Sequence, residues 1–269
     1  MSANTVRAVV FDWAGTVIDH GSQAPMGVFV KAFGKFDVKI TVDEARGPMG
    51  MAKRDHIKAL MALDSVSKQW LKRHGRTPTE ADIDKVYEVF VPMNVEAVTD
   101  YADLIEGAAE VTKTLRARGV KIGSTTGYVR EIMDRVIPLA KKQGYEADSL
   151  VCAGDLSAGR PSPLMLYKTF ADLGVWPAWR CVKVDDTVVG VEEGLNAGCW
   201  TVAVALTGNA FGLNPKETKA LSEKEFAARR DKAYGELTRA GAHFVIDGVA
   251  DLLPVIDEIE GCLARGERP

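Results

Sequence analysis

Residues 9–19 read VVFDWAGTVID, an apolar run that ends in an aspartate and leads into a turn of small residues. Asp12 directly follows four apolar residues, which predicts a buried strand with a carboxylate at its carboxyl end. Ligands of open α/β sheets bind at that edge, so Asp12 is a candidate nucleophile, a candidate metal ligand, or both. Two residues later, where many enzymes with this kind of strand end carry a second aspartate as proton donor, the chain has Ala14.

The rest of the chain repeats this alternation of apolar strand and amphipathic helix. Helical periodicity in the segments between the apolar runs favours a Rossmann-like, doubly wound parallel sheet of the α/β class, with helices on both faces. Continuous apolar runs are typical of strands that are buried on both faces. The predicted strands cover 7–12, 120–127, 149–155, 181–186, 200–208 and 242–247.

One long interval lacks strand signals and carries amphipathic stretches instead. We expect residues 21–99 to form a helical cap domain, inserted after the first strand and lying over Asp12. Residues 1–20 and 100–269 then form the α/β core domain, which carries the catalytic site. Thr41 with Glu44 forms a capping box that supports a helix in the cap, and Thr79 with Asp82 is a weaker version of the same start signal.

Composition narrows the class of protein. The 269 residues are 46% hydrophobic and 26% charged, with a formal net charge of −3, so neither nucleic acid nor a membrane surface is an expected partner. No apolar run approaches the roughly 20 residues that a membrane-spanning helix needs. The four cysteines show no CxxC spacing, which argues against a cysteine metal site or a disulfide framework. We expect a cytoplasmic protein.

Polar side chains recur where the predicted strands end. A parallel sheet brings these ends to one edge and would gather carboxylates, a hydroxyl and a guanidinium there. Carboxylate oxygens without histidine or thiolate suit Mg²⁺, and a phosphoryl-like group needs such a set around it. Asp12 could then attack phosphorus. The residues are Asp12, Thr125, Thr126, Arg160, Asp185 and Asp186.

These segments, taken in order, resemble the four motifs of the haloacid dehalogenase superfamily. FDWAGTVID resembles the first motif, with Asp12 as nucleophile, and the end of STT resembles the second, most closely at Thr126. Arg160 in GRPSP stands where the family usually has lysine, and VDDTVVGVEEGLNAG resembles the acidic fourth motif. The resemblance covers nearly the whole core and implies an aspartyl nucleophile, but it does not specify the substrate.

Ala14 departs from that pattern, because phosphatases of the family use an aspartate there to protonate the leaving alkoxide. Loss of a general acid costs roughly 10²–10⁴ in rate. Either the chain is a weakened relative, or its leaving group is not an alkoxide.

The cap offers a reason for this departure. In GPMGMAKRDHI (47–57), Lys53 begins a predicted helix and His56 lies three residues on, on the same face. Nearby cations, such as Arg54 and Lys58, or desolvation under a closed cap would lower the pKa of Lys53. A neutral lysine amine can form a Schiff base with an aldehyde and accept the electron pair of a breaking P–C bond. Such chemistry needs no acid at position 14.

FDWAGT paired with GPMGMAKRDHI resembles the phosphonatase branch of the superfamily. That resemblance implies that Lys53 condenses with phosphonoacetaldehyde and that Asp12 attacks phosphorus, giving acetaldehyde and phosphate. It also implies that Asp12, Asp186 and the backbone carbonyl of Ala14 hold Mg²⁺.

The same resemblance implies further substrate contacts and a homodimer formed through the cap. It implies that Thr126 and Arg160 bind the phosphonate oxygens and that His56 and Tyr128 transfer protons. Met49 and Gly50 would line the substrate cavity.

Three alternatives stay open. A Mg²⁺-dependent phosphatase or sugar-phosphate mutase would need the acid that Ala14 lacks. A dehalogenase would not need the acidic pair at 185–186. A non-catalytic phospholigand-binding protein could keep the same side chains without turnover.

Overall fold

The structure is a computed structural model that describes residues 5–269; residues 1–4 of the predicted core domain lie outside the described residues. Its centre is a six-stranded sheet in the order β3-β2-β1-β4-β5-β6, with every strand parallel to its neighbours. All six predicted strands are confirmed. They are β1 (Ala8–Phe11), β2 (Lys121–Thr126), β3 (Ser149–Cys152), β4 (Cys181–Asp185), β5 (Trp200–Val204) and β6 (Phe244–Ile246).

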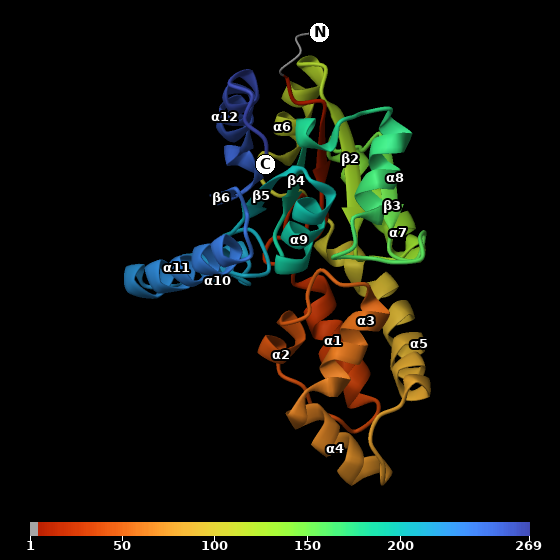
Figure 1. Ribbon diagram of the computed structural model, residues 1–269. Helices are drawn as coiled ribbons and strands as arrows, with labels where there is room; N and C mark the ends of the chain where they lie inside the picture. The colour runs from red at the N-terminus through yellow and green to blue at the C-terminus, as the bar shows by residue number, and fades with distance from the viewer. Residues whose placement is uncertain (1–4) are drawn as a thin grey trace.

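Helices cover both faces of the sheet, as a doubly wound fold requires (Figure 1). Successive side chains of β1 point to opposite faces, so Val9 and Phe11 pack in one hydrophobic cluster and Ala8 and Val10 in another. The first face carries α6 (Ala108–Ala117), α7 (Arg130–Lys142) and α12 (Leu252–Ala264). The second carries α8 (Leu164–Leu173), α9 (Val188–Ala197) and α11 (Glu223–Arg239), with α10 (Pro215–Lys219) before α11.

A separate group of helices lies beyond the carboxyl ends of the strands, in the orange part of Figure 1. These helices bury their own cluster of apolar side chains, in which the rings of Phe29 and Phe90 stack with centroids 4.3 Å apart. They therefore have a core of their own, although the exact domain boundaries remain a prediction. The helices are α1 (Ala24–Gly34), α2 (Val42–Arg46), α3 (Lys53–Ala62), α4 (Asp64–His74) and α5 (Glu80–Ala97).

The predicted capping signals start two of these helices. At α2 the Glu44 amide donates to Thr41 Oγ1 at 3.1 Å, and the Thr41 amide donates back to the Glu44 carboxylate at 2.8 Å. At α5 the Asp82 carboxylate accepts from the Thr79 amide at 2.9 Å. Each bond satisfies an amide that the first turn of a helix leaves without a partner.

Strand ends differ from the prediction in length. The runs 149–155 and 200–208 leave the sheet early, at Cys152 and Val204. The residues after them turn into loops at the edge where the cap sits, because glycine and polar residues replace the β-branched run there. These loops carry side chains of the site described next.

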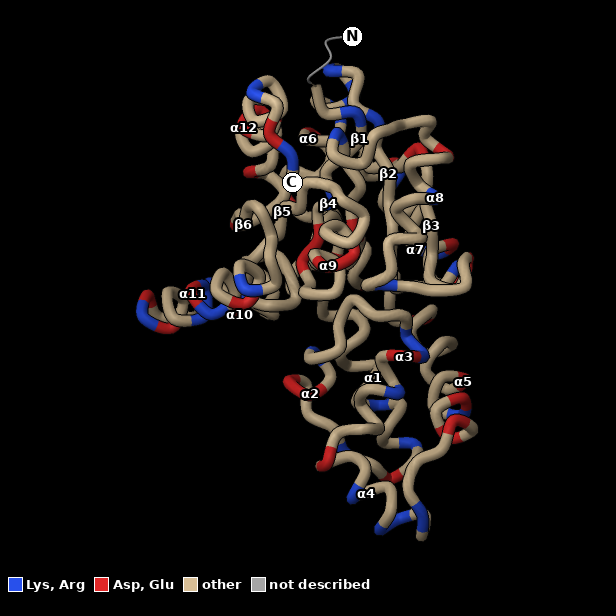
Figure 2. The backbone as a smooth tube through the Cα atoms, in the orientation of Figure 1, with Lys and Arg blue, Asp and Glu red and all other residues tan. Residues whose placement is uncertain are grey.

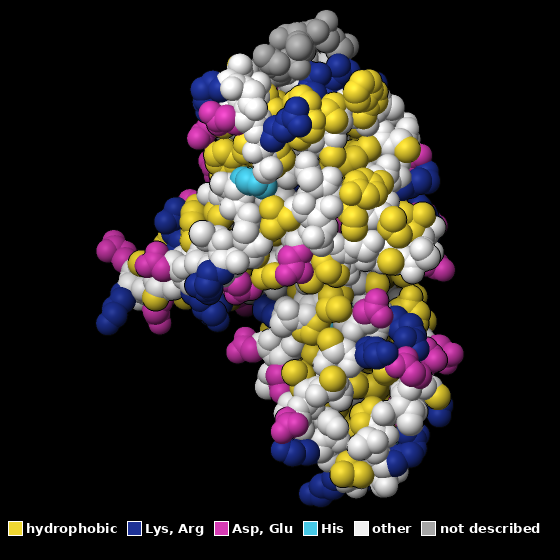
Figure 3. All heavy atoms as spheres, viewed as in Figure 1, with side chains coloured by type: hydrophobic (Ala, Val, Ile, Leu, Met, Phe, Trp, Pro, Cys, Tyr) yellow, Lys and Arg dark blue, Asp and Glu magenta, His cyan; other side chains and the backbone are white. Residues whose placement is uncertain are grey.

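Charge is mixed over the surface. Figure 3 shows basic and acidic side chains interspersed on the projecting α10–α11 region. None of the helices within residues 5–269 combines the length and the apolar character needed to cross a bilayer. The four cysteines are free and buried.

Candidate active site

The polar residues predicted at the strand ends meet where the cap covers the sheet edge. Asp12, Thr126, Arg160 and Asp186 line a small cavity of about 20 Å³, whereas Thr125 and Asp185 do not. Both the core and the cap contribute, because α3 and the loop before it reach down onto the carboxyl ends of the strands. The lining residues are Asp12, Ala14, Ser22, Met49, Gly50, Lys53, Thr126, Gly127, Tyr128, Arg160, Asp186 and Thr187.

Asp12 is 5% exposed at the end of the central strand. Its Oδ1 lies 2.8 Å from Arg160 Nη2. Burial raises the pKa of Asp12 to about 6, against the opposing effect of the Arg160 cation. The guanidinium therefore fixes one carboxylate oxygen and leaves Oδ2 as the oxygen outside that ion pair.

Three carboxylates crowd this point, since oxygens of Asp12, Asp185 and Asp186 lie within 4.8 Å of one another. Asp186 Oδ2 accepts a hydrogen bond from the backbone amide of Asn209 at 2.7 Å, but Asp186 Oδ1 is buried without a hydrogen-bond partner. Burial, together with the charges of Asp12 and Asp185, holds the pKa of Asp186 well above its ordinary value. Buried like charges with an orphaned oxygen fit a hard divalent cation such as Mg²⁺.

Asp185 differs from its neighbour because its oxygens are already engaged. Oδ1 accepts from Thr187 Oγ1 at 2.7 Å and from the Thr187 amide at 3.0 Å. Oδ2 lies 3.0 Å from Lys183 Nζ and 3.3 Å from Arg160 Nη1. Of the acidic pair, Asp186 is the better candidate for a metal ligand.

Lys53 enters the cavity from the first turn of α3. The residue is 3% exposed, and its Nζ lies 3.8 Å from Met49 Sδ and 5.0 Å from the centroid of the Tyr128 ring. Burial lowers the pKa of Lys53 to about 8, opposed by the negative charge of Asp12. Lys53 thus has the buried, weakly basic amine that imine formation needs.

Of the two causes predicted for that lowered pKa, desolvation is the larger. Arg54 and Lys58 face the cap surface, where Arg54 pairs with Asp84 at 2.7 Å and both cations pair with Glu80. The cation that does act on the Lys53 amine is Arg160, from the core. The prediction that Arg54 and Lys58 lower the pKa of Lys53 is therefore wrong, because acidic residues of α5 neutralise these two cations.

His56 does not line the cavity. Its ring is buried against Phe29 with centroids 4.1 Å apart, and its Nε2 lies 2.8 Å from the carbonyl oxygen of Ala45. Burial and the nearby Lys53 charge hold the pKa of His56 well below its ordinary value. The spacing of three residues puts His56 beside Lys53, but its Nε2 contacts α2 and its Nδ1 is buried without a hydrogen-bond partner.

The other predicted contacts do reach the cavity. Thr126 Oγ1 accepts the Tyr128 amide at 3.1 Å, and the Tyr128 hydroxyl is buried without a partner. Met49 and Gly50 form the cap side of the wall. Ser22 also lines the cavity, with a buried hydroxyl that has no partner. Sequence reasoning missed Ser22, because a lone serine in a loop carries no signal.

Gly50 packs closely against the core. Its φ is +91°, and an added Cβ would lie 2.3 Å from Thr187 Oγ1 and 2.6 Å from Val189 Cγ2. Gly50→Ala should therefore prevent the cap loop from seating, and kcat/KM should fall by about 100-fold or more. Gly27→Ala on α1 is the control, since nothing lies within 4 Å of its added Cβ. Equal kcat/KM for the two variants would contradict this reading of the loop.

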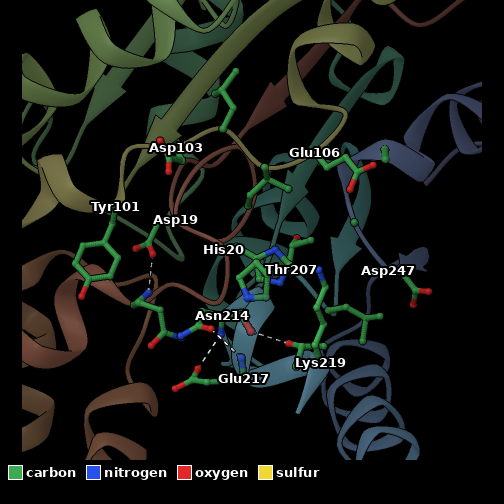
Figure 4. A pocket seen from close by; sticks show the side chains of 18 of the residues that line it. Asp19, His20, Tyr101, Asp103, Glu106, Thr207, Asn214, Glu217, Lys219 and Asp247 are labelled. Atoms are coloured by element: carbon green, nitrogen blue, oxygen red, sulfur yellow. Dashed lines mark hydrogen bonds between the residues drawn. The ribbon is translucent and has the colours of Figure 1, made fainter. Parts of the chain in front are cut away.

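A larger pocket of about 870 Å³ opens elsewhere on the core (Figure 4). Its labelled side chains include the carboxylates of Asp19, Asp103 and Glu106. Among the described residues, its lining shares none with the cavity that contains Asp12 and Lys53. We place the candidate site in the smaller cavity, because that is where Asp12, Lys53 and Arg160 converge.

Known proteins match the chain over most of its length. A family model described as haloacid dehalogenase-like hydrolase matches residues 6–198. The phosphonoacetaldehyde hydrolase of Paraburkholderia xenovorans (strain LB400) is 58% identical over 264 residues, which cover 98% of this chain and 99% of that protein. The phosphonoacetaldehyde hydrolase of Aeromonas hydrophila is 48% identical over 266 residues, which cover 98% of this chain and 95% of that protein.

A solved structure, a phosphonoacetaldehyde hydrolase-like protein from Oleispira antarctica, superposes with a TM-score of 0.96 at 42% identity, covering 100% of this chain and 99% of that one. The chain therefore belongs to the haloacid dehalogenase-like hydrolases and, among them, to the phosphonoacetaldehyde hydrolases, and it is an enzyme.

Proposed function

We propose that this enzyme hydrolyses the P–C bond of phosphonoacetaldehyde, giving acetaldehyde and inorganic phosphate. The observation that carries the proposal is the meeting of Lys53 and Asp12 in one small cavity, with Ala14 where an acid would otherwise stand. The names of the relatives support the same substrate.

Lys53 acts first as a nucleophile toward the aldehyde. Its neutral amine adds to the carbonyl carbon, water leaves, and the resulting imine takes up a proton. The positive nitrogen then withdraws electrons from the adjacent carbon. When the P–C bond breaks, its electron pair flows into an enamine, so no acid is needed at position 14.

Asp12 supplies the new bond to phosphorus. A carboxylate oxygen attacks as the P–C bond breaks, which leaves an aspartyl phosphate. Water then hydrolyses the acyl phosphate and releases inorganic phosphate. The enamine takes up a proton on carbon, and a second water frees acetaldehyde and returns the Lys53 amine.

A magnesium ion fits the carboxylate cluster. Asp12, Asp186 and the backbone carbonyl of Ala14 would hold it. When bound, it would neutralise the crowded carboxylates and the phosphonate charge. Lys53 lies outside this set of oxygen ligands, so the imine step depends on the chain's own amine.

The remaining residues bind and orient the substrate. Arg160 and Thr126 would hold phosphonate oxygens, for which the planar guanidinium suits bidentate contact. The unpartnered Tyr128 hydroxyl is the better candidate for moving a proton near the imine, because Tyr128 lines the cavity and His56 does not. Met49 and Gly50 would shape the space around the aldehyde.

The deciding experiment incubates the enzyme with Mg²⁺ and phosphonoacetaldehyde and follows phosphate and acetaldehyde together. A parallel sample is quenched with borohydride for peptide mass analysis. Equal release of both products, with a reduced adduct on the peptide that carries Lys53, is expected. Cleavage of ordinary phosphate esters instead would favour a Mg²⁺-dependent phosphatase or mutase. Tight phosphate binding without turnover of any substrate would favour a non-catalytic binding protein.

Ala14→Asp should not raise the rate of P–C cleavage. A carboxylic acid two residues after the nucleophile could protonate an alkoxide, but the enamine leaving group needs no such help. We expect kcat to stay equal or to fall, since the new carboxylate joins three others. Phosphate release from phosphonoacetaldehyde measures this. A gain of about 100-fold, the scale of general-acid catalysis, would show that protonation of the leaving group had been limiting.

Imine formation at Lys53 should depend on pH around its lowered pKa of about 8. At pH 7 roughly a tenth of the amine is then neutral, and the fraction rises to nearly all above pH 9. The initial rate of borohydride trapping with acetaldehyde should follow this curve. The exposed Lys113 in the same digest is an internal control. A midpoint above pH 10 at Lys53 would contradict the effect of burial.

A homodimer formed through the cap remains a prediction from the resemblance, and a cytoplasmic location remains a prediction from the composition. Sedimentation of the purified enzyme, with and without substitutions on the cap surface, tests the first.

A further inference from the structure

A network of buried charges lies behind Asp12, between β4 and α9. Lys183 points into it from the middle of β4 and Glu193 from α9, and both side chains are fully buried. Figure 2 marks acidic positions along α9, close to β4. The helix can approach the strand this closely because Gly190 lacks a side chain: an added Cβ would lie 1.9 Å from Asp185 Cγ.

Glu193 contacts the guanidinium of Arg160 at Nε, the guanidinium nitrogen nearest the backbone. Arg160 Nε donates to Glu193 Oε2 at 3.0 Å, and Arg160 Nη2 donates to the Thr125 carbonyl oxygen at 2.7 Å. Nη2 is also the nitrogen that lies 2.8 Å from Asp12 Oδ1, so the two contacts hold the edge of the guanidinium that meets Asp12. They fix the plane of the guanidinium and direct Nη2 to Asp12 Oδ1.

Lys183 holds Glu193 in turn. Its Nζ lies 3.2 Å from Glu193 Oε2 and donates to Thr125 Oγ1 at 2.7 Å, and that hydroxyl donates to Glu193 Oε2 at 3.0 Å. A carboxylate buried this deeply is tolerated when cations and donors surround it. Arg160 and Lys183 provide the two cations. Their charges neutralise the Glu193 carboxylate, and their contacts orient it.

We propose that Glu193, held by Lys183, is a positioning residue for Arg160. It sets the direction in which the guanidinium meets Asp12 and a phosphonate oxygen, without touching either itself. This inference rests on the proposed function, in which Arg160 binds the phosphonate group.

Glu193→Gln tests the proposal, with Glu192→Gln on the same helix as the matched control. Glutamine keeps the shape but removes the charge that holds Nε. We expect kcat/KM for phosphonoacetaldehyde to fall by about 10- to 100-fold, as for a misplaced catalytic group. The inhibition constant for inorganic phosphate should rise, because the same guanidinium would bind it. Trapping of acetaldehyde on Lys53 should change little, since Arg160 acts on the Lys53 amine only through its positive charge, which this variant keeps.

A second variant separates positioning from stability. Lys183→Met combined with Glu193→Gln removes both charges together, which restores neutrality in the interior. We expect its melting temperature to recover relative to Lys183→Met alone, while kcat/KM stays low. Recovery of both quantities, or a Glu193→Gln enzyme as active as Glu192→Gln, would overturn the proposal. If the unmodified enzyme released neither acetaldehyde nor phosphate, the proposed function would fail instead.

Discussion

Lys53→Arg is expected to abolish turnover of phosphonoacetaldehyde, with a loss of roughly 10⁴-fold or more, the scale seen when a covalent catalytic group is removed. Arginine keeps the positive charge and much of the length of lysine. Its guanidinium stays protonated at any usable pH and cannot form an imine with an aldehyde. The P–C bond would then have no electron sink. Continuous measurement of phosphate release quantifies the loss.

Two further measurements separate lost chemistry from lost structure. Mg²⁺ binding should be largely intact, because Lys53 lies outside the carboxylate cluster of Asp12, Asp185 and Asp186. Lys58→Arg is the matched control, since Lys58 lies farther along the same helix and faces the surface, where it pairs with Glu80. A fully active Lys53→Arg enzyme would rule out the imine mechanism.

Most of the sheet could be predicted from the sequence, because each strand is a continuous apolar run that ends in a small or acidic turn. The order of the strands then places Asp12, Thr126 and Asp186 at one edge, since β1 lies between β2 and β4. The site follows from topology more than from any single residue. An aspartate after a strand is common, whereas several polar strand ends that meet at one edge are not.

Side-chain direction could not be predicted in the same way. The spacing of Lys53 and His56 puts them on one face of a helix, but only the packing of α3 against α2 shows that the His56 ring contacts Ala45 and Phe29. Thr125 and Thr126 are neighbours on β2, yet one joins the ion network and the other lines the cavity. Successive strand residues point to opposite faces, so choosing between them requires the register of the sheet.

Lys183 did leave a signal in the sequence. In CVKVDD it interrupts an apolar run that every neighbouring position predicts to be buried. A buried lysine needs an anionic partner, and Glu193, on the helix that directly follows, is the one that packs against it. The sequence predicted that Arg160 binds the substrate, but not that Glu193 holds the Arg160 guanidinium in place.

Asp12→Asn is expected to separate the two halves of the reaction. The amide keeps the shape of the carboxylate but is not a nucleophile, so phosphate release should fall by roughly 10⁴-fold or more. Imine formation should survive, because the negative charge of Asp12 raises the pKa of Lys53 and its removal makes the amine less basic. The neutral fraction of Lys53 at pH 7 would therefore rise.

Mass analysis after borohydride treatment reads out this separation directly. The unmodified enzyme, given phosphonoacetaldehyde, should yield an ethyl adduct on Lys53, since the P–C bond has broken before reduction. Asp12→Asn should yield an adduct on the same lysine that still carries the phosphonate. An ethyl adduct in the variant would mean that water, rather than Asp12, attacks phosphorus. The absence of any adduct would mean that the Asp12 carboxylate is required before the imine forms, and the order of steps proposed here would have to be reversed.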